Sequence, residues 1–317
     1  MISKPMDVLE KFPIRKTNQQ KTAFLEAVTK FTRDIGYQTN VEEGKRGVRN
    51  IVIGDPENAR YLITAHYDTP ASIGLPNFIV PNNPAAFFGF QFALVSVLLA
   101  IAVGVGLIAY HFSNNTRASF LAGYLVYFAI LILMLKGPAN KSNANDNTSG
   151  IVTLLEILSA LPDSLRKDVC FVLFDMEEAG LVGSAVYRKL HKAATENQIV
   201  LNLDCVGDGD VIQLTPVKKA RNDEALLNAL SKVCVFKGEK ELRLRSKGFY
   251  GGSSDHKNFP FGVAIMAFHH KKGLGLYCGR IHTWRDKILE VRNVQILTDA
   301  LISLIAEHSG KTIEILK

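Results

Sequence analysis

The chain has 317 residues, a formal net charge of +7 and 47% apolar residues, which suits one large α/β domain with a substantial core. Its basic residues are dispersed and it contains no motif for binding RNA or DNA, so we expect no nucleic-acid partner. Four scattered cysteines without CxxC spacing argue against a disulfide framework and fit a reducing compartment.

One helix and three strands are predicted before the first apolar block. Residues 18–35 carry apolar side chains on one stripe, as in an amphipathic helix. The third strand ends at His66, and ligands bind at the carboxyl ends of strands in open α/β sheets. Asp68 lies two residues further on, so it shares a face with His66 in an extended segment. A lone histidine at this place is more often structural, but the HxD spacing favours a functional pair. The three strand patterns cover residues 37–42, 49–53 and 61–66.

Two long apolar segments then interrupt the domain pattern. Residues 87–110 and 118–135 contain no charge, and each is about long enough to cross the roughly 30 Å hydrocarbon core of a bilayer. We therefore predict a transmembrane helical hairpin that contacts lipid through residues 87–135. A pair of buried core helices, or a hydrophobic lid packed on a dimer mate, are the alternatives. The predicted division is a peptidase domain of residues 1–83 and 137–317, with the hairpin inserted at 84–136.

The orientation of this hairpin is predicted from its flanks. Lys136 and Lys141 lie on the domain side and Arg117 lies in the turn, a difference that decides little by itself. The N-terminal segment lacks the apolar core of a signal peptide. We therefore expect a two-pass membrane protein with its catalytic domain in the cytoplasm, where the basic surface would face an anionic leaflet.

Acidic residues follow the predicted strands after the hairpin. A polar loop over residues 137–150 carries Asp146, and a strand at 198–203 delivers Asp204. Another strand, over 168–175, leads directly into Glu177 and Glu178. Adjacent acids at the end of a core strand repel each other and cost desolvation energy, and a bound cation is the usual compensation. Helical patterns are predicted at 151–161 and 180–194.

The last third of the chain adds further candidates. Tyr250 is a candidate for polarising a substrate carbonyl. Asp255 and His256 either support the site or are a helix cap and a surface histidine. His282 enters from a glycine-rich loop that we expect to be mobile, with Asp286 as a support. The elements predicted here are a strand at 211–214, helices at 223–236 and 291–306, and the loop at 269–286.

These residues can be assigned to a pair of divalent metal ions. Two such ions carry four positive charges, which three carboxylates and a bridging hydroxide would balance, while two neutral histidines would complete the shells. Mixed N and O donors suit Zn²⁺, although Mn²⁺ or Co²⁺ would also be accepted. Glu177 remains as the acid that does not bind metal and can act as general base. The predicted ligands are His66, Asp146, Glu178, Asp204 and His282.

The segments AHYDT, NDNTSG, EEAGLVGS, LDCVG, SSDHKNF and HTWRD resemble, in this order, the motifs of the two-zinc aminopeptidases of peptidase family M28. The resemblance covers roughly residues 18–83 and 137–310. It implies an α/β fold with a mixed central sheet flanked by helices on both faces. It also implies that Asp146 bridges the ions, that Asp68 orients His66 through its second ring nitrogen, and that the Asp146–Asn147 peptide bond is cis. The reaction implied is removal of N-terminal residues from peptides by a metal-bound hydroxide.

Three alternatives stay open on the sequence. A glutaminyl cyclase-like acyltransferase shares the fold by family resemblance but uses one zinc, which the full ligand set argues against. A catalytically inactive, membrane-anchored binding protein would usually have lost a ligand or Glu177, and all are present. A carboxypeptidase or dipeptidase is also compatible with these residues.

Overall fold

A mixed ten-stranded sheet forms the centre of the molecule in the computed structural model, which describes residues 1–72, 74–75 and 77–308. The strand order is β1-β2-β4-β3-β5-β9-β6-β8-β7, and β10 pairs with β9. The four central strands β4, β3, β5 and β9 are parallel to one another. The strands are β1 (Thr39–Glu43), β2 (Arg49–Ile53), β3 (Tyr61–His66), β4 (Val169–Phe174), β5 (Ile199–Leu203), β6 (Val211–Pro216), β7 (Val235–Lys237), β8 (Lys240–Leu244), β9 (Phe261–Lys271) and β10 (Gly275–Tyr277).

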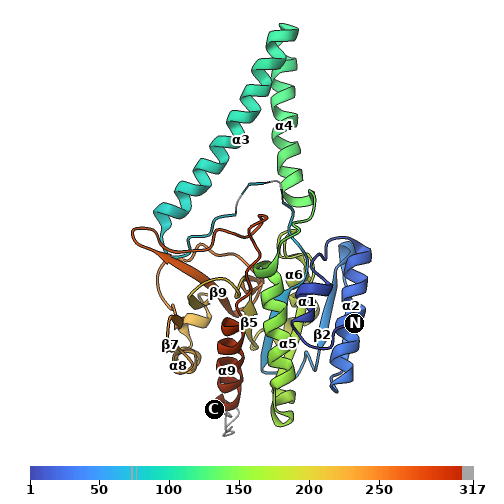
Figure 1. Cartoon of the computed structure of the whole chain (residues 1–317), viewed down its shortest axis with the longest axis vertical. Helices are drawn as coiled ribbons and strands as arrows, with labels where there is room; N and C mark the ends of the chain where they lie inside the picture. The colour runs from blue at the N-terminus through green and yellow to red at the C-terminus, as the bar shows by residue number, and fades with distance from the viewer. Residues whose placement is uncertain (73, 76, 309–317) are drawn as a thin grey trace.

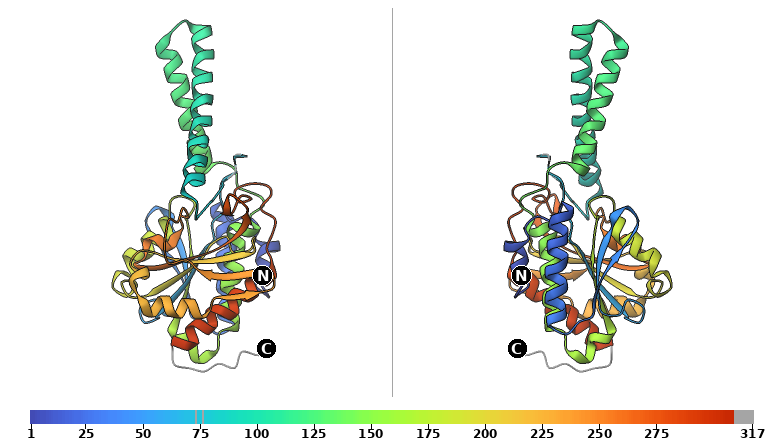
Figure 2. Two further views of the ribbon diagram at one scale, coloured as in Figure 1. Left: turned by 90° about the vertical axis from the view of Figure 1, so that its left-hand side faces the viewer. Right: turned by 90° about the vertical axis from the view of Figure 1, so that its right-hand side faces the viewer.

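Helices cover both faces of this sheet (Figure 1, Figure 2). On one face α2, α5 and α9 pack in the same apolar cluster as Ile63 and Ala65 of β3. On the other face Leu62 of β3 packs in a cluster with Tyr187 of α6. The expected α/β fold with a mixed, doubly covered sheet is therefore confirmed. The helices of the domain are α1 (Asp7–Lys11), α2 (Asn18–Asp34), α5 (Gly150–Ala160), α6 (Val182–Leu190), α7 (Lys192–Thr195), α8 (Glu224–Lys232) and α9 (Val291–His308).

The central strands β3 and β4 are buried along their whole length. Strands that are covered on both faces read as continuous apolar runs, which is why their sequences lack alternation. Parallel strands end at the same edge of a sheet, so β3, β4 and β5 deliver the residues that follow them to one place. This carboxyl edge positions the candidate site.

Some predicted elements differ from the structure. The helix predicted at 223–236 ends at Lys232, and β7 begins three residues later. We predicted no strand over residues 261–268, which belong to β9, an 11-residue strand. The predicted mobile loop at 269–286 begins instead with the end of β9 and with β10, which pair in a hairpin. A short apolar run that is buried on both faces cannot be assigned to strand or helix by its periodicity, and this accounts for the miss at β9.

The two apolar segments form helices α3 (Pro84–Ser113) and α4 (Thr116–Lys136), which project from the carboxyl edge of the sheet (Figure 1). They contact each other where Gly123 of α4 lies against the backbone of Ala102 in α3. Both are long and apolar enough to cross a membrane, and most of their surface is exposed, with Phe92 of α3 at 75% and Phe120 of α4 at 77%. The alternative of two buried core helices is therefore wrong.

Candidate metal centre

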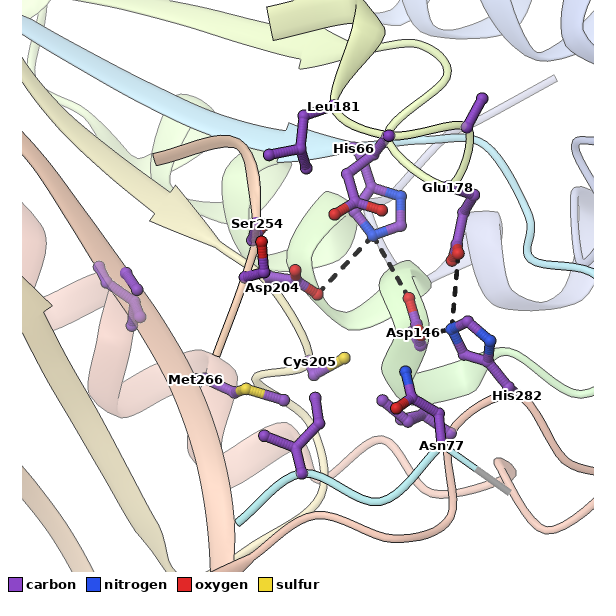
Figure 3. Close-up of a pocket in the computed structure, with 18 of the residues that line it drawn as sticks. His66, Asn77, Asp146, Glu178, Leu181, Asp204, Cys205, Ser254, Met266 and His282 are labelled. Atoms are coloured by element: carbon purple, nitrogen blue, oxygen red, sulfur yellow. Dashed lines mark ion pairs between the residues drawn. The ribbon is translucent and has the colours of Figure 1, made fainter. Parts of the chain in front are cut away.

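The five predicted ligands meet at the carboxyl edge of the sheet (Figure 3). Three of them lie at or shortly after the end of a parallel strand, namely His66 at the end of β3, Glu178 in the loop after β4 and Asp204 directly after β5. Asp146 comes from the single helical turn of residues 144–149 that precedes α5, and His282 from the loop between β10 and α9. Sheet topology thus gathers side chains that lie up to 216 positions apart in the sequence.

These side chains form two groups that share Asp146. Donor atoms of His66, Asp146 and Asp204 lie within 4.8 Å of one another, and so do those of Asp146, Glu178 and His282. The two carboxylate oxygens of Asp146 face different groups: Oδ1 lies 3.3 Å from Nε2 of His66, and Oδ2 lies 3.1 Å from Nε2 of His282. Asp146 therefore presents one carboxylate oxygen to each of the two groups.

The donor set fits divalent metal ions. Nε2 of His66 lies 3.7 Å from Oδ1 of Asp204, and Nε2 of His282 lies 3.5 Å from Oε2 of Glu178. Two ligands of a tetrahedral Zn²⁺ at about 2.0–2.2 Å are separated by roughly 3.3–3.6 Å, which is close to these distances. Nδ1 of His66 is buried and finds no hydrogen-bond partner within the described part of the chain, although Oδ1 of Asp68 lies 3.4 Å away. The residues fit one or two divalent ions, and mixed N and O donors suit zinc.

Asp68 holds the two adjacent glutamates as well as facing His66. Its Oδ1 accepts a hydrogen bond from the backbone amide of Glu177 at 3.0 Å, and its Oδ2 accepts one from the amide of Glu178 at 3.2 Å. The carboxylate is buried, with 5% of the residue exposed. Asp68 therefore fixes the loop after β4 relative to the end of β3.

Glu177 lies beside this centre and belongs to a third group, with His66 and Glu178. Burial, followed by the nearby carboxylates of Glu178 and Asp204, raises the pKa of Glu177. Burial and the carboxylate of Asp146 likewise raise the pKa of Glu178. The acids are thus packed where their negative charge is costly unless cations compensate it.

The loop that carries Asp146 is held by its neighbours through its backbone. Asp286 accepts hydrogen bonds from the amides of Asn145 at 2.7 Å and Asp146 at 3.0 Å. It therefore supports the loop of Asp146, whereas we had predicted that it would support His282. The side chain of Asn147 donates to the carbonyl of Leu203 at 2.9 Å, which ties this loop to the end of β5. The Asp146–Asn147 peptide bond is cis, as the resemblance implies.

Three residues at the centre adopt left-handed backbone conformations without being glycine. Met176, Cys205 and His282 have φ values of 54°, 55° and 59°. Each is itself a candidate ligand or lies within two residues of one. Such conformations cost free energy and persist where the surrounding structure enforces them, often at functional sites.

Sequence analysis missed Arg15, which is fully buried behind the centre. Its Nε donates to the carbonyl of Tyr67 at 2.6 Å, between the two residues of the HxD pair, and one terminal nitrogen donates to Oγ1 of Thr148 at 3.2 Å. Burial lowers the pKa of Arg15 to about 10, so it remains a cation at neutral pH. A single arginine in an irregular segment carries no periodic signal that would have revealed it.

The other predicted residues have mixed outcomes. Tyr250 lies in the wall of the candidate pocket. His256 is buried, so the surface-histidine alternative is wrong, and burial lowers its pKa to about 3. Asp255 is buried and accepts a hydrogen bond from Ser184, and burial raises its pKa to about 7. His269, at the start of the loop predicted over 269–286, was not among the predicted ligands, and its Nε2 lies 2.8 Å from Oδ1 of Asp208.

A cavity of about 320 Å³ adjoins the candidate ligands. Besides these polar groups it has a largely apolar wall, and one member of this wall, Leu135, comes from the last turn of α4. The hairpin therefore contributes directly to the pocket. The remaining wall includes Asn77, Ile79, Tyr250, Met266 and Ile281.

The model of peptidase family M28 matches residues 132–299, just over half of the chain. No curated protein matches the chain in sequence. The solved structures similar to it include a glutaminyl cyclase of Porphyromonas gingivalis, with a TM-score of 0.60 and 18% identity over 94% of each chain. A Zn-dependent exopeptidase of Parabacteroides distasonis has a TM-score of 0.58 and 15% identity over 93% of each chain. The LapA aminopeptidase of Legionella pneumophila has a TM-score of 0.57 and 15% identity, covering 98% of this chain and 72% of its own.

Proposed function

Because the chain belongs to peptidase family M28 and is a metallopeptidase, we propose that it is an aminopeptidase with two zinc ions at the carboxyl edge of its sheet. The observation that carries this proposal is the sharing of Asp146 between two groups of metal-ligand type. One ion would be held by His66, Asp146 and Asp204. The other would be held by Asp146, Glu178 and His282. The zinc-dependent exopeptidase with the same fold adds support for the metal.

The chain's own residues account for the handling of protons in hydrolysis. Bound divalent ions would supply Lewis acidity, which lowers the pKa of a water molecule and polarises the substrate carbonyl. Glu177, held through its amide by Asp68, would accept a proton from the attacking water and deliver it to the nitrogen of the leaving amine. Tyr250, which lines the pocket, would donate a hydrogen bond to the carbonyl oxygen.

The pocket suggests which peptides are cleaved. Its apolar wall, with Ile79, Met266 and Ile281, favours an apolar side chain at the first residue. A cavity of about 320 Å³ lies at the small end of ligand pockets, which suits the terminal residue of a peptide more than a long internal segment.

Replacing Glu177 with Gln tests the assignment of the base. We expect kcat to fall by about 10²–10⁴-fold, the usual contribution of a general base, with the metal content unchanged. Hydrolysis of aminoacyl and N-terminally blocked peptides, together with metal analysis of the same samples, measures both quantities. The exposed Glu224 is the matched control, and Glu224→Gln should leave both unchanged.

Two results would contradict this assignment. Retained activity in a metal-replete Glu177→Gln variant would exclude Glu177 as the base. Loss of metal from the variant would instead indicate that Glu177 is a ligand, which is possible because its carboxylate lies close to donor atoms of His66 and Glu178.

A glutaminyl cyclase-like activity is the second candidate, because the fold is also similar to that of a glutaminyl cyclase. Peptides with N-terminal glutamine separate the two functions. The peptidase releases free glutamine, whereas the cyclase forms an N-terminal pyroglutamyl ring and releases ammonia. Cyclisation without release of free amino acids would overturn the peptidase proposal.

We further propose that α3 and α4 cross the membrane, with the domain formed by residues 1–83 and 137–317 on the cytoplasmic side. The exposed apolar surface of both helices supports this placement. Because Leu135 lines the pocket and lies next to the end of α4 at Lys136, the pocket would open close to the bilayer. Substrates would then be peptides whose N-termini lie near the membrane surface.

Cysteine labelling tests this orientation. In a Cys234→Ser background, Ser113→Cys at the end of α3 should react with a membrane-impermeant maleimide applied to intact cells. Lys218→Cys on the domain should react only after lysis. The reverse pattern would place the domain on the other side, and labelling of both sites would exclude the cytoplasmic placement.

A further inference from the structure

Six exposed cations surround the two ends of the hairpin where they join the domain. We call these residues the cationic collar. Two of them end or follow α4, two lie in the loop before α9, and two end β9 or lie in the turn after it. They are Lys136, Lys141, Arg285, Lys287, Lys271 and Lys272.

Three collar residues, Lys141, Arg285 and Lys287, gather around Trp284, and the fourth at this end, Lys136, is the last residue of α4. Trp284 is 69% exposed and lines one surface depression together with Lys141 and Arg285. Asn140 connects this loop to the chain after α4, because its side chain donates to the carbonyl of Thr283 at 3.2 Å. The guanidinium carbon of Arg285 lies 5.5 Å from the Trp284 ring centroid, and Nζ of Lys287 lies 5.7 Å from it. The result is an exposed indole among cations beside the end of an apolar helix.

The other two collar residues lie at the beginning of α3. Asn83, which caps α3, donates through its side chain to the carbonyl of Leu274 in the β9–β10 turn at 3.2 Å. Lys271 ends β9, Lys272 begins this turn, and both are exposed. Figure 1 shows α3 and α4 meeting at their tip and diverging toward the domain, so the two groups of cations lie at separate ends.

No exposed acid within these segments offsets their charge. Residues 69–145 and 269–285 contain no Asp or Glu at all. Two acids next to these segments are buried and already bonded: Asp286 accepts from backbone amides, and Asp208 pairs with Arg280 at 2.8 Å. The charged side chains of these two segments are therefore all basic, and the exposed Asp210 lies outside them, with its Oδ2 4.0 Å from Nδ1 of His269.

We propose that the cationic collar and Trp284 bind the headgroup region of an anionic membrane, so that the hairpin-bearing face of the domain lies against the bilayer. The proposal rests on the proposed insertion of the hairpin. Polybasic segments next to membrane helices attract anionic lipids, and tryptophan is enriched at the interface because its ring is apolar and its N–H is polar. An acidic peptide would match the charge, but it would not explain why the cations lie at the helix ends or why Trp284 is exposed beside them.

The test uses Trp284 as the probe, because it is the only tryptophan in the chain. The full chain is reconstituted in nanodiscs of phosphatidylcholine, with or without phosphatidylglycerol and with lipids brominated on the acyl chains. We expect Trp284 emission at shorter wavelength, and stronger quenching by bromine, in the anionic discs. Salt at 1 M should remove the difference, because it shortens the screening length to about 3 Å.

Two variants that each remove four lysines distinguish an effect of the cationic collar from an effect of the net charge of the protein. The variant Lys136→Gln, Lys141→Gln, Lys271→Gln and Lys272→Gln leaves the two cations over the Trp284 ring in place and should lose the difference between the discs. The control is Lys167→Gln, Lys189→Gln, Lys192→Gln and Lys218→Gln, which removes four exposed lysines from elsewhere on the domain and should keep the difference.

Three outcomes would overturn the proposal. Equal emission and quenching in both discs, or equal loss in the collar and control variants, would exclude a lipid-specific role. A response to soluble polyglutamate but not to anionic lipid would identify an acidic peptide as the occupant. If the chain fails to co-elute with nanodiscs, the hairpin insertion is itself wrong. None of these readouts depends on hydrolysis, so they are independent of the peptidase proposal.

Discussion

The hairpin and the metal centre depart from the usual distribution of residues in opposite directions. The hairpin exposes large apolar side chains, with Phe92 at 75% and Phe112 at 82%. The centre buries ionisable ones, with His66 at 1% and Asp146 at 3%. Soluble domains ordinarily bury the first class and expose the second. Each region thus offers a surface that a partner of matching chemistry could satisfy, which we propose to be a lipid phase for the hairpin and cations for the centre.

The difference between the regions lies in how the partner is specified. In the proposed membrane placement any hydrocarbon phase would satisfy the hairpin, because crossing a bilayer requires only apolar surface over a sufficient length. The centre needs particular donor atoms at distances of 3.1–3.7 Å, which the ends of separate strands supply. The effect of a substitution in the hairpin should therefore depend on the polarity of the new side chain. In the centre it should depend on which donor atom is removed.

Removing the shared ligand should have the largest effect. Asp146→Ala eliminates the oxygens common to both groups, so we expect loss of both ions and of activity by several orders of magnitude. Asp204→Ala affects only one group and should retain about half of the bound metal. Metal analysis and peptide hydrolysis on the same samples measure both effects.

The control for these variants is Asp163→Ala, because the Asp163 side chain is 87% exposed and lies in the turn before β4, away from the carboxyl edge. Equal metal loss in Asp146→Ala and Asp204→Ala would refute the shared site. In chelator-treated protein, removing the Asp204 carboxylate relieves its repulsion with the neighbouring carboxylates. The melting temperature of Asp204→Ala should therefore not fall below that of the wild type.

A lysine in the middle of the hairpin should have the second-largest effect. Val97 is 49% exposed near the centre of α3, where a lysine costs about 2.5–3.5 kcal/mol in a bilayer. Val97→Lys should therefore reduce the fraction of protein that resists alkaline extraction from membranes. The same change at Asn114 in the turn should have little effect. Were the hairpin exposed to water, Val97→Lys would instead increase solubility.

The sequence predicted most of the centre because chemistry and topology coincide there. His66, Glu178 and Asp204 each end or follow a buried apolar strand, and parallel strands end at one edge. The hairpin was equally readable, since two uncharged apolar segments separated by seven residues leave few alternatives. Local sequence patterns thus predicted those features that a short stretch of residues determines by itself, such as the end of a buried strand or a long apolar helix.

What could not be predicted depends on contacts between distant segments. Arg15 acquires its place from Tyr67 and Thr148, which no spacing indicates. The role of Asp286 as an acceptor for the loop of Asp146 depends on how that loop folds over the sheet edge. The left-handed backbone at His282 likewise results from its surroundings, because non-glycine residues rarely prefer it.

Weakening the support of a ligand should have a smaller effect than removing the ligand. Asp68→Asn keeps the size of the side chain but removes the charge that faces His66 and accepts from the amides of Glu177 and Glu178. We expect metal affinity to fall by about 10–100-fold, as for other residues that orient ligands. Competition with a chelator measures this change, and full activity should return at saturating metal. Activity that stays low at saturating metal would give Asp68 a direct role in the reaction.

Leu135 is the residue where the two regions meet, and its replacement should have a moderate effect. Leu135→Asn removes an apolar wall of the pocket, so we expect KM for peptides with an apolar first residue to rise about tenfold with little change in kcat. Leu133→Asn is the matched control, because it makes the same change one half-turn away on α4, outside the pocket wall. Equal changes of KM in the two variants would mean that Leu135 has no specific contact with the substrate.

The smallest effect is expected at His191, whose imidazolium pairs with two acids of the same chain, Glu42 and Glu57. Nε2 of His191 lies 3.0 Å from Oε2 of Glu42, and Nδ1 lies 2.5 Å from Oε1 of Glu57. The hydrogen bond to Glu42 is the main cause that raises the pKa of His191, followed by that to Glu57 after the opposing cost of burial. A raised folded-state pKa stabilises the protein fully below the unfolded value of about 6.5, and this stabilisation is lost as the pH rises through the folded value.

His191→Gln removes this contribution. The free energy of unfolding should therefore differ between wild type and variant by about 0.2–1 kcal/mol per ion pair at pH 5.5, and the difference should shrink as the pH rises above 6.5. Urea denaturation at several pH values measures it. A difference that grows with pH would show that His191 is neutral in the folded protein, and it would remove the contrast with the metal centre, where the acids need a cation from outside the chain.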